Sequence, residues 1–126
     1  MQLSIEDSII NRYLPEQVSE KRDTPITHVL LHFSSNAQNK PDNPYQIEDT
    51  FEVFKEYGVS THYVIDRAGQ IYRFVPEDRI AYHAGKGRLT NYLSYENKLN
   101  DYSIGIELLA IGTKEEIVTN VNRRTI

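Results

Sequence analysis

Apolar and polar positions alternate along the chain in patterns that change from one segment to the next. Ser4, followed by apolar residues at helical spacing, predicts a short helix over 4–14. A polar, charged connector follows and extends to residue 24. The short, partly β-branched apolar run over 26–33 is bounded by proline and serines, which predicts a buried strand.

The loop after this strand ends in a strong signal for the start of a helix. Asn43 is the expected N-cap, Pro44 the first helical residue, and Gln46 the partner in a capping-box pattern. The apolar positions that follow share one face of a helix that is predicted to extend to Tyr57. Gly58 is the expected C-terminal cap.

Strand-like patterns dominate the second half of the chain. Two β-rich runs within 61–75 flank a turn in which Gly69 can adopt a positive φ, which predicts a β-hairpin. A long loop is expected over 76–100, and then a buried strand over 101–112. Thr113 begins a second capping-box pattern, so a helix is expected to start there.

This order of elements predicts an α/β fold, a single domain over 1–126 with a central mixed β-sheet flanked by helices. The formal net charge of −4 gives no basic surface for nucleic acid, and no apolar run is long enough to cross a membrane. The N-terminal residues do not have the pattern of a secretory signal. The chain has no cysteine, which excludes disulfides and thiolate metal ligands.

Four histidines are the first candidates for chemistry, and two of them lie in the first predicted strand. His28 and His32 are four residues apart, a spacing that would bring them together on a helix. On a strand, four residues span roughly 13 Å at about 3.3 Å per residue, so these two cannot bind one metal together. His32 is therefore either a structural residue or a single zinc ligand, since neutral imidazole suits zinc.

Glu107 is a carboxylate inside an apolar strand. It shares one face of that strand with Ser103 and Gly105, opposite a face of isoleucine and leucine. A buried carboxylate is costly unless something pairs with it. It indicates either an edge strand with a solvated face, or a general base that faces a cleft with Gly105 leaving room beside it.

Four motifs in order along the chain resemble one family. They are LLHFSS, STHYVIDRAGQIYRFVPED, AYHAGKG and NDYSIGIELLAIGT, and they fall within roughly residues 25–113. Each motif is weak alone, but their order and spacing together are specific. The chain resembles the type 2 N-acetylmuramoyl-L-alanine amidases, which are zinc hydrolases of bacterial peptidoglycan. This family is related to phage lysozyme-type amidases and to animal peptidoglycan recognition proteins.

The resemblance implies an activity, a partner and a cofactor. The family hydrolyses the amide bond between N-acetylmuramic acid and the L-alanine of the stem peptide, so peptidoglycan or a muropeptide is the expected partner. Zinc is the expected cofactor, because it lowers the pKa of a bound water and polarises a scissile carbonyl. His32 matches the first zinc ligand of the family. Glu107 matches the catalytic glutamate, which accepts a proton from the water.

Four further residues match family positions near the substrate, and we expect them to be substrate-binding residues. His83 is expected at the wall of the cleft, in the same loop as Tyr82. His62 is expected in the hairpin near the cleft, with a structural role as the alternative. Thr61 stands where other branches of the family carry a tyrosine, which places the chain nearer to the branch that uses a glutamate.

The chain departs from the family pattern after Gly112. The family continues with a segment that supplies a histidine and an aspartate or cysteine as further zinc ligands, and a lysine for the oxyanion. The remaining residues contain no such motif. The expected organisation is an N-terminal helix and connector over 1–24 and the family core over 25–113. The start of a helix is expected over 114–126, with the end of the domain missing.

Three interpretations of this departure are open. The chain is a C-terminally truncated part of an active zinc amidase, or a non-catalytic domain that binds muropeptides, or a subunit whose missing ligands come from an associated copy in a dimer. His83 or His62 as a substitute ligand is also open. A structural or interaction domain is the alternative from another class. We expect a bacterial or prophage protein that stays in the cytoplasm until its release to the cell wall.

Overall fold

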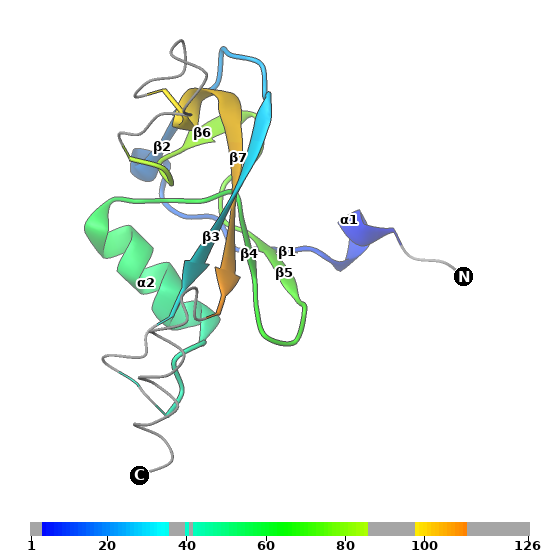
Figure 1. The fold of residues 1–126 in the computed structure, drawn as a ribbon, viewed down its shortest axis with the longest axis vertical. Helices are drawn as coiled ribbons and strands as arrows, with labels where there is room; N and C mark the ends of the chain where they lie inside the picture. Colours follow the sequence, from blue (N-terminus) through cyan, green and yellow to red (C-terminus); the bar gives the residue numbers. More distant parts are fainter. Residues whose placement is uncertain (1–3, 36–39, 41, 86–97, 111–126) are drawn as a thin grey trace.

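A mixed β-sheet covered by a helix positions the residues of interest. The structure is a computed structural model that describes residues 4–35, 40, 42–85 and 98–110. Five strands form the main sheet in the order β1-β5-β4-β7-β3, and two short strands, β2 and β6, pair separately. The strands are β1 Ile10–Asn11, β2 Ser19–Lys21, β3 His28–Ser34, β4 Tyr63–Ile65, β5 Ile71–Arg73, β6 Arg79–Ala81 and β7 Ser103–Leu109. The predicted α/β class with a central mixed sheet is confirmed (Figure 1).

The helix α2, Ile47–Tyr57, lies against one face of this sheet and closes the hydrophobic core. Phe51 of α2 and Phe74, which follows β5, are both buried and meet edge to face with ring centroids 5.5 Å apart. Val64 of β4 and Leu109 of β7 belong to the same buried cluster. The core therefore lies between α2 and the middle strands, on the side of the sheet where Figure 1 shows the helix.

The helix α2 begins later than its sequence signals predict. Its N-cap is Gln46, whose side chain makes no capping hydrogen bond. Asn43 and Pro44 lie in a turn instead, where the Asn43 N–H donates to the carbonyl of Lys40. The predicted C-terminal end is confirmed, because Gly58 has φ +68° and its N–H caps the last turn.

The predicted helix over 4–14 is wrong beyond its first turn. The helix α1 spans Ile5–Ser8, and the Ser4 side chain accepts a hydrogen bond from a backbone N–H of that turn. The chain then extends along the sheet, where β1 pairs with β5 in parallel and the Leu14 N–H donates to the carbonyl of Phe74. Because the sheet satisfies the backbone of this segment, tertiary pairing overrides the helical spacing of its apolar residues.

Two segments that were predicted to be irregular contain strands. The connector holds the 3-10 helix η1, Glu16–Val18, and then β2, while β6 lies within the predicted loop over 76–100. The strands β2 and β6 pair with each other in antiparallel orientation. Each has three residues and no alternating apolar pattern, so the local sequence contains no signal for either one.

The predicted β-hairpin is confirmed. β4 pairs with β5 in antiparallel orientation across the expected turn. Gly69 in that turn has φ +86°. The carboxylate of Asp66 accepts hydrogen bonds from the backbone N–H groups of Ala68 and Gln70, which holds the turn closed.

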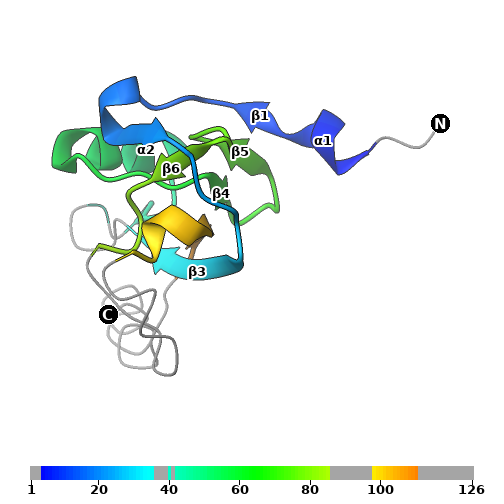
Figure 2. The same cartoon turned by 90° about the horizontal axis from the view of Figure 1, so that it is seen from above.

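The long strands β3 and β7 run parallel and pair in register along all seven residues. β7 lies inside the sheet between β4 and β3, and β3 forms the edge (Figure 2). The prediction of a buried strand is therefore wrong for β3, because it has a neighbour on one side only among the strands that the structure describes. Its outward-facing side chains are between 53% and 59% exposed, and they are Val29, Leu31 and Phe33.

The last described strand begins slightly later than predicted. β7 starts at Ser103, after the 3-10 helix η3 of Asn100–Tyr102. The helix predicted from Thr113 and the predicted segment 114–126 lie outside the described residues. No helix within the described part of the chain is long and apolar enough to cross a membrane.

Candidate active site

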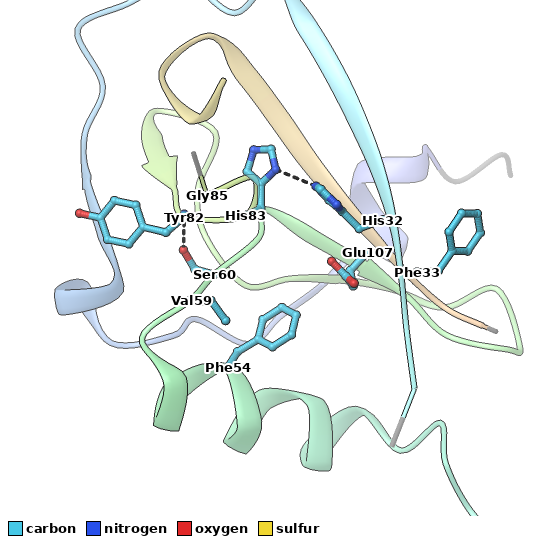
Figure 3. A pocket seen from close by; sticks show the side chains of 9 residues that line it. All are labelled: His32, Phe33, Phe54, Val59, Ser60, Tyr82, His83, Gly85 and Glu107. Carbon is cyan, nitrogen blue, oxygen red and sulfur yellow. Dashed lines mark hydrogen bonds between the residues drawn. The ribbon is translucent and has the colours of Figure 1, made fainter. Parts of the chain in front are cut away.

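A pocket of about 400 Å³ opens beside α2, on the face of the sheet that the helix covers. Its walls come from β3, β7, the C-terminal end of α2 with the loop after it, and the loop after β6. Figure 3 shows how these segments surround it. The lining residues are His32, Phe33, Phe54, Val59, Ser60, Tyr82, His83, Gly85 and Glu107.

Parallel pairing of β3 with β7 places His32 and Glu107 side by side. The two residues are register partners in the sheet, so their side chains leave it on the same face. Both side chains line the pocket (Figure 3). The sequence indicates each of them separately, and the strand pairing is what brings them together.

Glu107 is a buried carboxyl that titrates near neutral pH. The residue is 8% exposed, and burial raises its pKa to about 7. A carboxyl with such a pKa is suited to accept a proton and to return it. The alternative of an edge strand with a solvated face does not hold for β7, which has a strand on each side.

His83 joins the pair from the loop after β6. Its Nδ1 lies 2.9 Å from Nε2 of His32, and its Nε2 lies 2.9 Å from Oγ of Ser103. The Ser103 hydroxyl donates its one proton to the carbonyl of Leu99, 2.5 Å away, so Nε2–H of His83 donates to that hydroxyl. Nδ1 of His83 therefore carries a lone pair, which accepts a hydrogen bond from Nε2–H of His32.

The surroundings of His83 fix the position of its ring. A Cβ atom on Gly105 of β7 would lie 2.5 Å from Cγ of His83, so the ring packs directly on the glycine. The side-chain oxygen of Asn100 accepts hydrogen bonds from the backbone N–H groups of His83, at 3.1 Å, and Ala84, at 2.8 Å. The room that Gly105 was expected to leave beside Glu107 is thus occupied by the His83 imidazole.

Burial keeps both imidazoles in the pocket neutral. It lowers the pKa of His83 to about 3 and holds the pKa of His32 below its usual value. Neutral imidazole is the form that binds metal ions. The pocket therefore presents uncharged nitrogen donors beside a carboxyl that can change its charge.

Two expected substrate contacts lie behind the pocket. Thr61 and His62 have no exposed surface and do not line it. Nδ1 of His62 accepts a hydrogen bond from the Gly105 N–H at 3.0 Å, and its Nε2 lies 2.8 Å from the carbonyl of Arg79. Backbone groups engage both nitrogens, so His62 ties β7 to β6. This placement corrects the expected position of both residues at the cleft and agrees with the structural alternative for His62.

Tyr82 lines the pocket, although its ring points away from His32 and Glu107 in Figure 3. Two lining residues, Phe54 and Val59, lie outside the four motifs, and Ser60 begins the second motif without a role having been predicted for it. Ser60 Oγ accepts a hydrogen bond from the Tyr82 N–H at 2.8 Å, which joins two walls of the pocket. All three residues lie around the C-terminal end of α2, whose position the sequence predicts through Gly58.

The described residues supply only part of the donor set that a metal ion needs. Within the residues that the structure describes, no group of three histidines, aspartates or glutamates is placed to hold a metal. His32 and His83 bring two neutral imidazole nitrogens into one pocket, whereas His28 lies at the other end of β3. The pocket therefore supplies two nitrogen donors for a metal ion. A catalytic zinc site has three protein ligands and an open position, so these two donors are fewer than such a site requires.

The chain matches a family model and several curated relatives. The family model described as N-acetylmuramoyl-L-alanine amidase matches residues 22–123. The 1,6-anhydro-N-acetylmuramyl-L-alanine amidase AmpD of Salmonella typhimurium (strain LT2) is 50% identical over 50 residues. AmpD of Escherichia coli (strain K12) is 48% identical over 50 residues. These alignments cover 40% of this chain and span 25% of each relative.

Two solved structures have a similar fold. A selenomethionine derivative of AmpD superposes with a TM-score of 0.65 at 22% identity, covering 99% of this chain and 76% of that one. Staphylococcus aureus hydrolase AmiA in complex with its ligand gives a TM-score of 0.55 at 16% identity, covering 98% and 59%. These two likenesses concern the fold, while the family model covers most of the sequence. The chain belongs to the N-acetylmuramoyl-L-alanine amidase family.

Proposed function

We propose that this chain hydrolyses the amide bond between N-acetylmuramic acid and L-alanine in peptidoglycan or its soluble fragments. The observation that carries the proposal is Glu107, with a pKa of about 7, beside His32 in the pocket. The family supports this reaction class. The name of the AmpD relatives specifies 1,6-anhydro-N-acetylmuramyl-L-alanine, which supports a muramyl-L-alanine substrate for this chain.

In this proposal His32 holds a zinc ion in the pocket. The ion, when bound, activates a water molecule and polarises the scissile carbonyl. The support from this chain is chemical, since His32 is a neutral imidazole at the wall of the pocket.

Glu107 is the proposed carrier of the proton in the reaction. In its ionised form the carboxylate accepts a proton from the water as the water oxygen bonds to the carbonyl carbon. The protonated carboxyl then gives this proton to the amide nitrogen as the C–N bond breaks. The products are a muramic carboxylate and the free amino group of L-alanine. A pKa of about 7 suits both transfers at neutral pH.

The apolar side of the pocket supports a substrate with small apolar groups. Phe54 and Val59 line it from the end of α2, across from His32 and His83 in Figure 3. Such a wall can contact the methyl groups of the lactyl ether and of L-alanine.

Release of amino groups from a soluble muramyl-L-alanyl peptide tests the proposal. We expect release that requires added zinc and stops with a chelator. His32→Ala should abolish it. His28→Ala is the matched control, at the other end of the same strand, and should retain it. A folded, zinc-supplemented protein that binds the peptide without releasing amino groups would contradict the amidase proposal and favour a muropeptide-binding domain.

A further inference from the structure

We propose that the chain has a second binding site, for an N-acetylhexosamine unit of a glycan, at the edge of the sheet formed by β1 and β5. This site is separate from the pocket of His32 and Glu107, which lies beside β3 at the opposite edge. The inference rests on the proposed function for the choice of a sugar, because N-acetylmuramic acid belongs to this class.

Two adjoining cavities form the site, and Tyr13 and Pro76 line both of them. The larger, here called the polar cavity, has a volume of about 350 Å³ and a mostly polar wall. The smaller, here called the apolar cavity, has a volume of about 130 Å³ and a mostly apolar wall. Beyond the two shared residues, the polar cavity is lined by Glu6, Tyr63, Arg73, Glu77 and Asp78.

The polar cavity mainly offers hydrogen-bond acceptors. Its cation, Arg73, is already engaged within the protein, where Nη2 donates to the carboxylate of Glu6 at 2.7 Å. The hydroxyl of Tyr63 donates to Oε1 of Glu77 at 2.5 Å. Since a carboxylate accepts several hydrogen bonds, Glu77 and Asp78 can accept more from a ligand. The cavity therefore fits a ligand that is rich in hydroxyl and amide donors.

The charge of the polar cavity selects against acidic ligands. Three carboxylates and one guanidinium line it, which gives a formal net charge of −2. Such a cavity repels the carboxylates of a peptide and of nucleic acid phosphates alike, whereas a neutral sugar carries no charge to be repelled. A ligand with an ammonium group is the alternative that the experiment below distinguishes.

The junction of the two cavities matches the apolar parts of an N-acetylated sugar. Tyr13 at this junction is 49% exposed, so its ring can contact the apolar face of a pyranose. The apolar cavity beside it is backed by Leu14, Phe74 and Val75, all of which are buried. This wall suits the methyl of an acetamido group, while the hydroxyls of the sugar face Glu77 and Asp78.

The second site and the catalytic pocket face away from each other. Tyr63 of β4 pairs with Arg73 of β5, and the next residue of β4, Val64, pairs with Glu107. Because neighbouring residues of a strand point to opposite faces, Tyr63 and Arg73 leave the sheet on the side opposite Glu107. One sugar cannot occupy both sites. The second site therefore binds another sugar of the same polymer and keeps the catalytic pocket near its substrate.

Binding of tri-N-acetylchitotriose, a neutral oligomer of N-acetylglucosamine, tests the site without using catalysis. Calorimetric titration of the whole 126-residue chain should show binding, and cellotriose, which has no acetamido groups, should bind about tenfold more weakly. Tyr13→Ala and Asp78→Asn should each weaken binding by about tenfold. Tyr57→Ala is the matched control, because Tyr57 is 73% exposed and lines neither cavity, and it should bind as the wild type does. Circular dichroism checks the fold of each variant.

A second measurement uses the wild type and covers a failure of Tyr13→Ala to fold. In assigned amide ¹H–¹⁵N spectra, the oligomer should shift the signals of Tyr13, Tyr63 and Glu77 more than those of His32 and Glu107. No binding, equal affinity for cellotriose, tighter binding of cationic glucosamine oligomers, or shifts confined to the pocket of His32 and Glu107 would overturn the inference.

The two proposals fail separately. If the oligomer binds at Tyr13 but no amide is hydrolysed, the sugar site stands and the proposed function fails. If a soluble muramyl-L-alanyl peptide is hydrolysed but the oligomer does not bind, the proposed function stands and the sugar site fails.

Discussion

Burial determines the charge of each titratable side chain in the pocket. It raises the pKa of Glu107 to about 7 and lowers the pKa of His83 to about 3. The two shifts have opposite signs because desolvation disfavours the charged form, which is the deprotonated carboxylate in one case and the protonated imidazole in the other. Near neutral pH the pocket therefore combines neutral nitrogen donors with a carboxyl that is partly ionised.

Replacing Glu107 by glutamine should change how stability depends on pH. The Glu107 carboxyl has a pKa of about 7 in the folded protein, above the ordinary 4.5, so the folded state binds the proton more tightly than the unfolded state does. The stability linked to this proton is complete below the unfolded pKa and is lost as the pH rises through about 7. Glu107→Gln should therefore exceed the wild type in free energy of unfolding above neutral pH, by no more than about 3 kcal/mol.

Urea unfolding at a series of pH values, with chelator present, measures this difference. The gap between Glu107→Gln and the wild type should close toward pH values of about 4. A gap that is the same at every pH would show that burial does not raise the pKa of Glu107.

At the scale of elements, local signals identify some parts of the fold and miss others. The end of α2 at Gly58 and the turn at Gly69 follow from the sequence, because each needs a residue that tolerates positive φ. The strands β1, β2 and β6 do not follow from it. Each has two or three residues and depends on a distant partner that no local pattern reveals.

The residues of the candidate site can likewise be predicted from the sequence only in part. Motifs indicate Glu107, His32 and His83, and the pairing of β3 with β7 and the loop after β6 bring them into one pocket. The roles of Ser103 and Gly105 as supports for His83 are not visible locally, because they lie about twenty residues further along the chain and meet it through the sheet. A motif likewise does not show which of its side chains face the pocket. His62, for example, belongs to a motif but is buried behind the pocket.

The packing of α2 on the sheet gives a prediction for stability. Phe74 has no exposed surface and meets Phe51 and Phe54 of α2 edge to face, at 5.5 Å and 6.2 Å. Phe74→Ala should lower the free energy of unfolding by about 3–5 kcal/mol, because it leaves a cavity between helix and sheet. Phe33→Ala is the matched control on the edge strand, where the residue is 53% exposed, and should cost less than about 1 kcal/mol. Equal losses in urea unfolding would show that α2 does not pack on the sheet as described.

For the whole molecule, the pocket depends on segments that lie far apart in the sequence. Arg22, just after β2, donates hydrogen bonds to four backbone carbonyls on both sides of the site, those of Glu77, Arg79, Asp101 and Ser103. It thereby ties the region of β6 to the start of β7. The family match begins at this arginine, so the whole pocket lies within the matched residues.

Hydrolysis of a soluble muramyl-L-alanyl peptide by the wild type and by Glu107→Gln, at equal zinc content, tests the account most directly. The wild type should release amino groups, and Glu107→Gln should do so about 100-fold more slowly or worse, because it cannot accept the proton of the water. Zinc content should not differ between the two proteins. Release by Glu107→Gln at the wild-type rate would contradict the assignment of Glu107 as the general base of this pocket.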